Sequence, residues 1–168
     1  GWTVLHQMVV EGVHGTGGLE AVQVLLESGA SPNRKDHHGF TAMHTVIDHA
    51  TGIAWGHRED YIPLLIQSPA AVQTVVDRCV AVLAVLLQYG GNANSGAHAW
   101  LPSLIGALLA WTPNAALPAE IRSRFYTALL QVLFDHGASP NVPSPWHDGM
   151  YPLQQWLRLE ADGAARLK

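Results

Sequence analysis

The sequence predicts an all-α fold built from repeated helix pairs, and two observations support this prediction. A helix end that closes on Gly and Asn occurs three times, as LLESGASPN, LLQYGGNAN and LFDHGASPN. In the residues before each copy, apolar side chains recur three and four positions apart, which is the spacing of one face of an α-helix. A motif that recurs together with its helix indicates one structural unit copied along the chain.

A second motif marks where each unit begins. Thr is followed three positions later by His in TVLH (Thr3–His6) and TAMH (Thr41–His44), and YPLQ (Tyr151–Gln154) is a degraded copy. GWTVLH, DHHGFTAMH and GMYPLQ resemble the opening of an ankyrin repeat, and the three Gly-and-Asn endings resemble its close. The sequence departs from the family at PSLI (Pro102–Ile105), which lacks both the Thr and the His.

The resemblance implies an ankyrin-like helical solenoid of three to four repeats with β-turn fingers. The outer helices are expected to be elongated, because the residues that open the second and third predict helices longer than is usual in the family. It also implies that the His of each opening hydrogen-bonds neighbouring backbone and holds the turn. The residues expected to define the units are the Thr and His of the openings, the Gly of the helix ends and the Asn of the closings. They are Thr3, His6, Thr41, His44, Gly29, Gly90, Gly137, Asn33, Asn94 and Asn141.

The helices follow in order from these signals. Inner helices are predicted at Val4–Glu11, Ala42–Ala50, Ser103–Trp111 and Pro152–Glu160. Each outer helix ends at a Gly, the residue best suited to the left-handed cap conformation. Ser68 and Pro69 are typical of an N-cap and a first helical position, so the second outer helix should run for about 20 residues. Pro118 is expected to open the third.

The distances between the closing motifs exceed the family period of about 33 residues, so we expect insertions between inner and outer helices. Their Gly, Pro and polar content predicts loops at Val13–Gly18, Thr51–Gln67 and Thr112–Leu117. We therefore divide the single domain 1–168 into repeat 1 at 1–33, repeat 2 at 34–94, repeat 3 at 95–141 and a partial repeat 4 at 142–168. Because it begins inside a repeat opening, the chain is expected to be a fragment of a longer protein.

Composition excludes several classes of protein. A net charge of −4, with nine scattered Lys and Arg residues, argues against a nucleic-acid binder. The apolar runs are too short to span a bilayer. The single cysteine, Cys79, cannot form an internal disulfide and fits a reducing compartment. We expect an intracellular protein of the cytoplasm or nucleus, monomeric, without nucleic-acid or membrane partners.

The ten histidines invite a metal or catalytic hypothesis, but their spacing does not support one. His37, His38 and His44 form no helical i, i+4 pair, and no cluster has zinc-ligand spacing. Cys79 lies on an apolar stripe, which favours packing over nucleophilic chemistry. GTGG (Gly15–Gly18) lacks the Lys and Ser or Thr of a phosphate-binding loop. We predict no enzyme activity, no metal and no cofactor.

The resemblance implies recognition of a partner protein or peptide by the concave surface of fingers and inner helices. Alignment of the fingers places His37, His98 and His147 in one column, and two fingers carry Trp, the type of residue that dominates interfaces. The candidate partner-binding residues are Arg34, Lys35, His37, His38, His98, Trp100, Trp146, His147, Asp48, His49, Gln154 and Gln155.

Two alternatives remain open at this point. The exposed His and Trp residues could be incidental surface residues. The chain could also be a structural scaffold or capping segment of a larger multidomain protein, with no external ligand at this surface.

Overall fold

The computed structural model describes residues 1–15, 17–55, 69–98, 101–110, 119–142 and 154. These residues form six helices and one antiparallel pair of three-residue strands, so the described part is all-α in class. The helices are α1 (Val4–His14), α2 (Gly18–Glu27), α3 (Ala42–Trp55), α5 (Pro69–Gln88), α6 (Leu104–Ala110) and α7 (Ala119–Asp135). The strands are β1 (Gly96–His98) and β2 (Leu101–Ser103).

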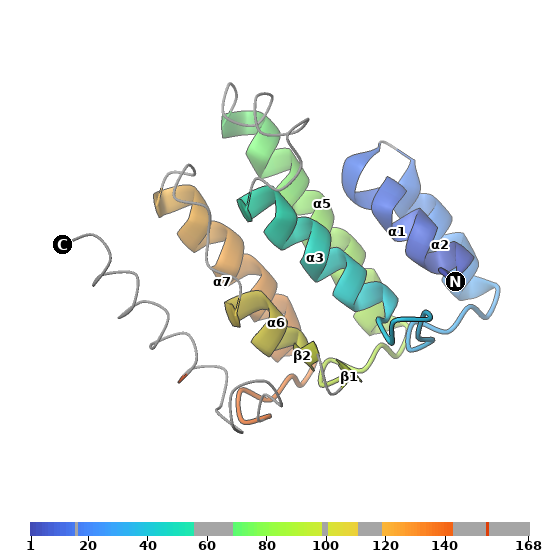
Figure 1. Ribbon diagram of the computed structural model, residues 1–168. Helices are drawn as coiled ribbons and strands as arrows, with labels where there is room; N and C mark the ends of the chain where they lie inside the picture. Colours follow the sequence, from blue (N-terminus) through green and yellow to red (C-terminus); the bar gives the residue numbers. More distant parts are fainter. Residues whose placement is uncertain (16, 56–68, 99–100, 111–118, 143–153, 155–168) are drawn as a thin grey trace.

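The helices lie side by side in two layers (Figure 1). One layer consists of the inner helices α1, α3 and α6, with α1 packed on α3 and α3 on α6. The other layer consists of α2, α5 and α7, with α2 packed on α5 and α5 on α7. Each helix also packs on its sequence neighbour in the opposite layer, so α1 pairs with α2, α3 with α5 and α6 with α7.

One hydrophobic core runs between the two layers. Val9, Ile47 and Leu108 contribute from α1, α3 and α6, and Leu83 and Leu129 contribute from α5 and α7; all five are fully buried. These residues belong to the apolar stripes that recur at helical spacing in the sequence, and burial of such a stripe supplies most of the stability of a helix in water. No helix within the described ranges is both long and apolar enough to cross a membrane.

The ends of α2, α5 and α7 share one capping geometry. Gly29, Gly90 and Gly137 adopt φ values of 90°, 86° and 79°. Such positive φ values favour glycine because it has no Cβ. At each end the glycine N–H and the next N–H donate to carbonyls of the last helical turn, as in the bonds from Gly29 to Leu26 (3.0 Å) and from Ala30 to Leu25 (2.9 Å). The three closing motifs therefore form three copies of the same helix end.

The predicted loop at Val13–Gly18 is wrong in extent. Val13 and His14 belong to α1, and Gly18 is the first residue of α2. Val13 is fully buried four positions after Val9, so it continues the apolar face and prolongs the helix. A Cβ at Gly18 would overlap the backbone of Gly12 in α1, so glycine here permits close helix approach rather than loop flexibility.

Two further boundaries differ from the prediction. Helix α3 continues to Trp55, so the insertion cannot begin at Thr51. The Gly, Pro and polar content after Ala50 predicted a loop, but one internal glycine, Gly52, costs only about 1 kcal/mol relative to Ala, which packing can outweigh. Ser103 ends β2 instead of opening α6, and its Oγ accepts a hydrogen bond from the Gly106 N–H (3.2 Å), as an N-cap does.

The 20-residue length and the Pro69 start predicted for the second outer helix are confirmed by α5. Cys79, in the middle of α5, is fully buried, and burial raises the pKa of its thiol to about 12. This thiol therefore packs in the core in its neutral form. The predicted helix Pro152–Glu160 is outside the described part except for Gln154, and Thr112–Leu117, Ser68 and Pro118 lie outside it entirely.

Candidate functional site

The segment between α2 and α3 turns sharply at Asp36–Phe40. The Asp36 N–H donates to the Phe40 carbonyl (2.8 Å), and the Gly39 N–H donates to the Asp36 carbonyl (3.1 Å). The Asp36 carboxylate accepts from the backbone N–H groups of His38 (2.8 Å) and Phe40 (2.9 Å) at the same oxygen, Oδ1. Asp favours such turns because its short side chain can bond backbone two residues on. We call residues 34–40 the first finger.

The turn also sets the charge of Asp36. Partial burial raises the pKa of its carboxyl, but the hydrogen bonds from the Phe40 and His38 N–H groups, together with charge interactions with His6 and His37, outweigh burial, so the pKa is lowered. Hydrogen bonds to a carboxylate stabilise its charged form. Asp36 is therefore ionised at neutral pH and is held by the backbone of its own turn.

His6, at the start of α1, holds the base of the first finger. Its Nδ1 is 2.7 Å from Thr3 Oγ1, and its Nε2 is 3.0 Å from the Phe40 carbonyl oxygen. A carbonyl can only accept, so Nε2 carries the hydrogen and donates to Phe40, while Nδ1 accepts from the Thr3 hydroxyl. The His6 side chain is buried, with 1% of its surface exposed. The opening of one unit therefore fixes the finger that follows it.

His44 repeats the local half of this arrangement. Thr41 Oγ1 lies 2.8 Å from His44 Nδ1, and the Thr41 N–H also donates to Nδ1 (3.2 Å). Burial, assisted by the nearby Lys35 ammonium, lowers the pKa of His44 to about 4, although the Ser95 backbone acts in the opposite direction. The ring is thus neutral at physiological pH, and its role is to hold the start of α3 through Thr41.

The Asn of each closing motif bridges to the next helix end. Asn33 Nδ2 donates to the Gly90 carbonyl (2.8 Å), and Asn33 Oδ1 accepts from the Asn92 N–H (2.7 Å). In the same way, Asn94 donates to Gly137 (3.0 Å) and accepts from Ser139 (2.6 Å). The sequence marked these residues only as the close of each unit and the bridge was not predicted, although the recurrence of Asn at the same distance from each helix end was a signal for it.

Asn141 occupies the third position of this series. Its N–H donates to Ser139 Oγ (3.2 Å), as the Asn33 N–H donates to Ser31 Oγ (3.3 Å). The local turn after α7 therefore repeats the turn after α2.

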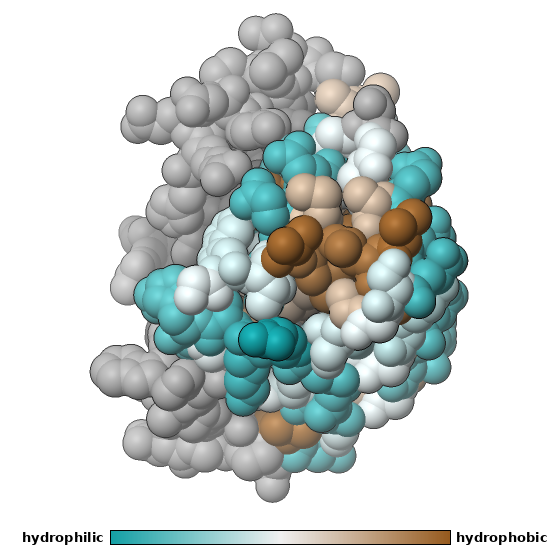
Figure 2. Space-filling view, turned by 90° about the vertical axis from the view of Figure 1, so that its right-hand side faces the viewer, coloured by the Kyte–Doolittle hydropathy of each residue, from teal (hydrophilic) through white to brown (hydrophobic). Residues whose placement is uncertain are grey.

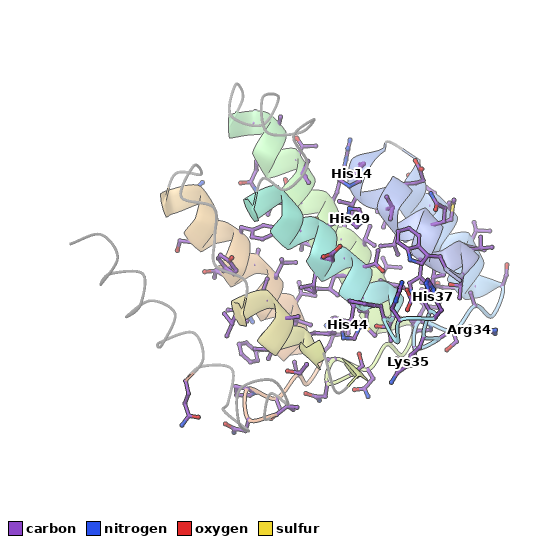
Figure 3. The ribbon with its side chains drawn as sticks, in the orientation of Figure 1. His14, Arg34, Lys35, His37, His44 and His49 are labelled. Atoms are coloured by element: carbon purple, nitrogen blue, oxygen red, sulfur yellow. The ribbon has the colours of Figure 1, made fainter. Side chains whose placement is uncertain are left out.

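Four candidate partner-binding residues lie on the first finger. The side chains of Arg34, Lys35, His37 and His38 are all exposed. The rings of His37 and His38 are adjacent, with centroids 3.6 Å apart. In Figure 3, Arg34, Lys35 and His37 lie together at the end of the molecule that carries this finger. The turn thus presents cationic and imidazole groups outward from a fixed backbone.

Two other candidates lie on α3, away from the finger. Asp48 is exposed, and His49 is half-buried. His49 Nδ1 is 2.9 Å from Nε2 of His14 on α1, so one ring donates a hydrogen bond to the other. Figure 3 shows this pair at the opposite end of the inner helices from Arg34 and Lys35. The structure therefore separates the predicted residues into two groups on one layer.

The end of α1 has one contact that was not predicted from the sequence. Arg78 on α5 donates from Nη1 to the backbone carbonyl of His14 (3.2 Å). A cationic donor at a helix C-terminus satisfies a carbonyl that has no partner within the helix. No local pattern around Arg78 signals this contact, because it joins residues that are far apart in sequence.

In the described part of the chain, the structure does not bring the remaining candidate residues together in a site. His98 lies in β1, where its backbone pairs with Leu101, and Gln154 is exposed. Trp100, Trp146, His147 and Gln155 lie outside the described residues. The predicted row of three histidines therefore stays a prediction. Among the residues that the structure describes, no three His, Cys, Asp or Glu side chains are arranged to hold a metal ion.

Comparison with known families bears on the first helix pair. Residues 1–37 match the family model of the ankyrin repeat. Residues 1–37 are an ankyrin repeat. This ankyrin repeat comprises the Thr3–His6 opening, the capped end of α2 and Asn33, and it extends into the first finger. No curated protein matches the chain.

Proposed function

We propose that this protein is a recognition module that binds a partner protein or peptide on the concave surface formed by its fingers and inner helices. Ankyrin repeats are generally protein–protein interaction modules and typically have no catalytic activity, and one such repeat occupies residues 1–37. The observation that supports the proposal best is the first finger, where a hydrogen-bonded turn carries exposed side chains. A preorganised surface of this kind loses little conformational entropy on binding.

We further propose that the helix pairs stack as an ankyrin-like solenoid divided at 1–33, 34–94, 95–141 and 142–168. The Asn33 and Asn94 bridges support this division, because each one joins equivalent atoms in successive units. The three identical helix ends support it as well.

A selection from a displayed peptide library, with the whole chain as bait, tests the recognition proposal. We expect the selected peptides to bind less tightly to Trp146→Ala, by about 1 to 3 kcal/mol, because large aromatic anchors dominate interface energetics. The melting temperature should stay nearly unchanged. The triple variant His37→Ala, His98→Ala, His147→Ala should also bind more weakly. Equal binding by wild type and the triple variant would contradict the proposed surface and move the site elsewhere, first to the segment at 56–67.

A scaffolding role is the second candidate, and one observation favours it. Figure 2, which looks onto the α1–α2 side of the molecule, shows apolar side chains gathered on that face. Among the exposed large apolar side chains, Val4 (65%) lies on α1, Val24 (59%) on α2 and Trp2 (51%) just before α1. Contiguous apolar surface of this kind is typical of faces that pack against another folded unit. A library that yields no peptide whose binding depends on the fingers would favour the scaffolding role.

A further inference from the structure

The first finger differs in charge from the molecule as a whole. The chain carries a net charge of −4. Arg34 and Lys35 are nevertheless adjacent and exposed on the first finger. Lys35 is close enough to the buried His44 for its ammonium to help lower the pKa of that ring. The finger is therefore a local cationic site on an acidic protein.

The neighbouring carboxylate is already engaged by the turn. Asp36 is only partly exposed, and its Oδ1 accepts two backbone hydrogen bonds. The backbone N–H groups of His38 and Phe40 therefore fix the orientation of this carboxylate. A ligand carboxylate can approach Arg34 and Lys35 from the solvent side without competing for the bonds that hold Asp36.

The exposed imidazoles extend the same surface. His37 and His38 follow the two cations after Asp36, and their rings lie next to each other. Imidazole N–H groups donate hydrogen bonds to anionic oxygens, and the planar guanidinium of Arg matches carboxylate or phosphate in a bidentate manner. We call Arg34, Lys35, His37 and His38 the cationic finger.

We infer that the cationic finger binds an acidic segment of a partner protein, through carboxylate or phosphate oxygens. This inference rests on the recognition function proposed above and specifies its partner. The anionic part of the segment must be short, because Glu11 on α1 and Asp48 on α3 are exposed on the adjacent inner helices. A long uniform polyanion such as a nucleic acid would be repelled where it passes these two carboxylates.

The test uses the whole chain and a displayed library of random peptides. We expect the selected peptides to be enriched in Asp and Glu at one end. The double variant Arg34→Glu, Lys35→Glu should bind them about tenfold more weakly, because two exposed ion pairs become repulsive contacts. The loss should shrink as salt is raised, since exposed charges are screened. Arg124→Glu provides the matched control for Arg34→Glu, because Arg124 is exposed on α7, away from the finger.

Synthetic versions of a selected peptide then identify the anion. Asp, phosphoserine and Ser are placed in turn at the enriched acidic position. Tighter binding of the phosphoserine peptide than of the Asp peptide indicates a phosphorylated partner, and equal binding indicates a carboxylate. Replacing the acidic residue by Lys should restore binding to the charge-reversed finger. Circular dichroism of each variant checks that the fold is unchanged.

The outcomes separate this inference from the function on which it rests. Selected peptides that depend on Trp146 but show no acidic bias, and bind the charge-reversed finger as well as the wild type, would overturn the inference and leave the recognition function standing. A library that yields no concave-surface binder would overturn both. Tighter binding of a DNA duplex than of any acidic peptide, lost in the charge-reversed finger, would overturn the inference in favour of nucleic acid.

Discussion

Two connections lead from an outer helix to the next inner helix, and they use different residues for the same task. From α2 to α3, the Asp36 turn is held by His6 from the preceding unit, and Thr41 with His44 begins the helix. From α5 to α6, the chain instead pairs β1 with β2. Ser103 alone caps the helix through the Gly106 N–H.

The difference shows what the Thr and His of the opening contribute. In the second connection, Gly106 occupies the place that His44 has in the first, three residues after the residue that precedes the helix, and it has no side chain that can hydrogen-bond a neighbouring unit. Backbone pairing between Gly96 and Ser103 and between His98 and Leu101 supplies local order in its place. The first connection depends on a buried polar network, and the second on strand pairing and one cap.

The largest expected effect is a loss of folding stability at low pH, which arises from His44 and therefore only from the first connection. The pKa of His44 is about 4 in the folded state, against about 6.5 for an exposed imidazole. As the pH falls from 6.5 to 4, the unfolded chain binds a proton that the folded chain does not, so the free energy of unfolding decreases. The loss from this one residue is about 3 kcal/mol when complete at low pH.

Urea unfolding of wild type and His44→Gln across this pH range measures the effect. The wild type should lose stability more steeply than the variant between pH 6.5 and 4, whatever their difference at pH 7. His37→Gln, at an exposed position, should keep the wild-type slope. Parallel slopes for wild type and His44→Gln would show that the first connection does not depend on a neutral His44.

A smaller effect is expected at His6. His6→Ala removes the donor to the Phe40 carbonyl and leaves a cavity at a buried position, so unfolding should become easier by about 2 kcal/mol. Amide hydrogen exchange at Gly39 and Phe40 should accelerate more than exchange in β1 and β2. His38→Ala, on the same finger but exposed, should change stability by less than about 0.5 kcal/mol. Equal acceleration of amide exchange in the two connections would show that His6 does not hold the first connection specifically.

The smallest effect is expected at Ser103. Ser103→Ala removes the cap of α6 and should cost about 1 kcal/mol, a typical value for an N-cap. The paired strands remain, so the loss should be smaller than at His6. Ser123→Ala, at an exposed position on α7, is the control in the same chemical denaturation experiment. A loss at Ser103 as large as the loss at His6 would mean that β1 and β2 add nothing to the second connection.

The features that the sequence predicted correctly are those with a local cause. Pro69 marks the start of α5, and Gly29, Gly90 and Gly137 mark helix ends, because these residue types restrict or permit particular backbone angles. The ends of α1 and α3 were missed because burial decides them. Val13 prolongs α1 through contacts with the core that composition does not reveal.

The candidate site divides in the same way. A finger at residues 34–40 follows from turn-forming residues between two helices, and its exposed side chains follow from its polarity. The pairing of His14 with His49 and the reach of Arg78 to the end of α1 depend on which helices become neighbours. Such contacts join positions tens of residues apart, and no local pattern encodes them.

The asparagine bridges give the molecule tolerance to changes in chain length. Asn33 reaches Gly90 across 57 residues of sequence, whereas Asn94 reaches Gly137 across 43, yet the bonds are equivalent. The distance between successive helix ends is thus set by an Asn side chain and not by the number of residues between them. The segments between an inner and an outer helix can therefore change in length while the fingers keep their geometry. The edge of the molecule that these segments form is thus free to vary between related sequences and to accept grafted loops.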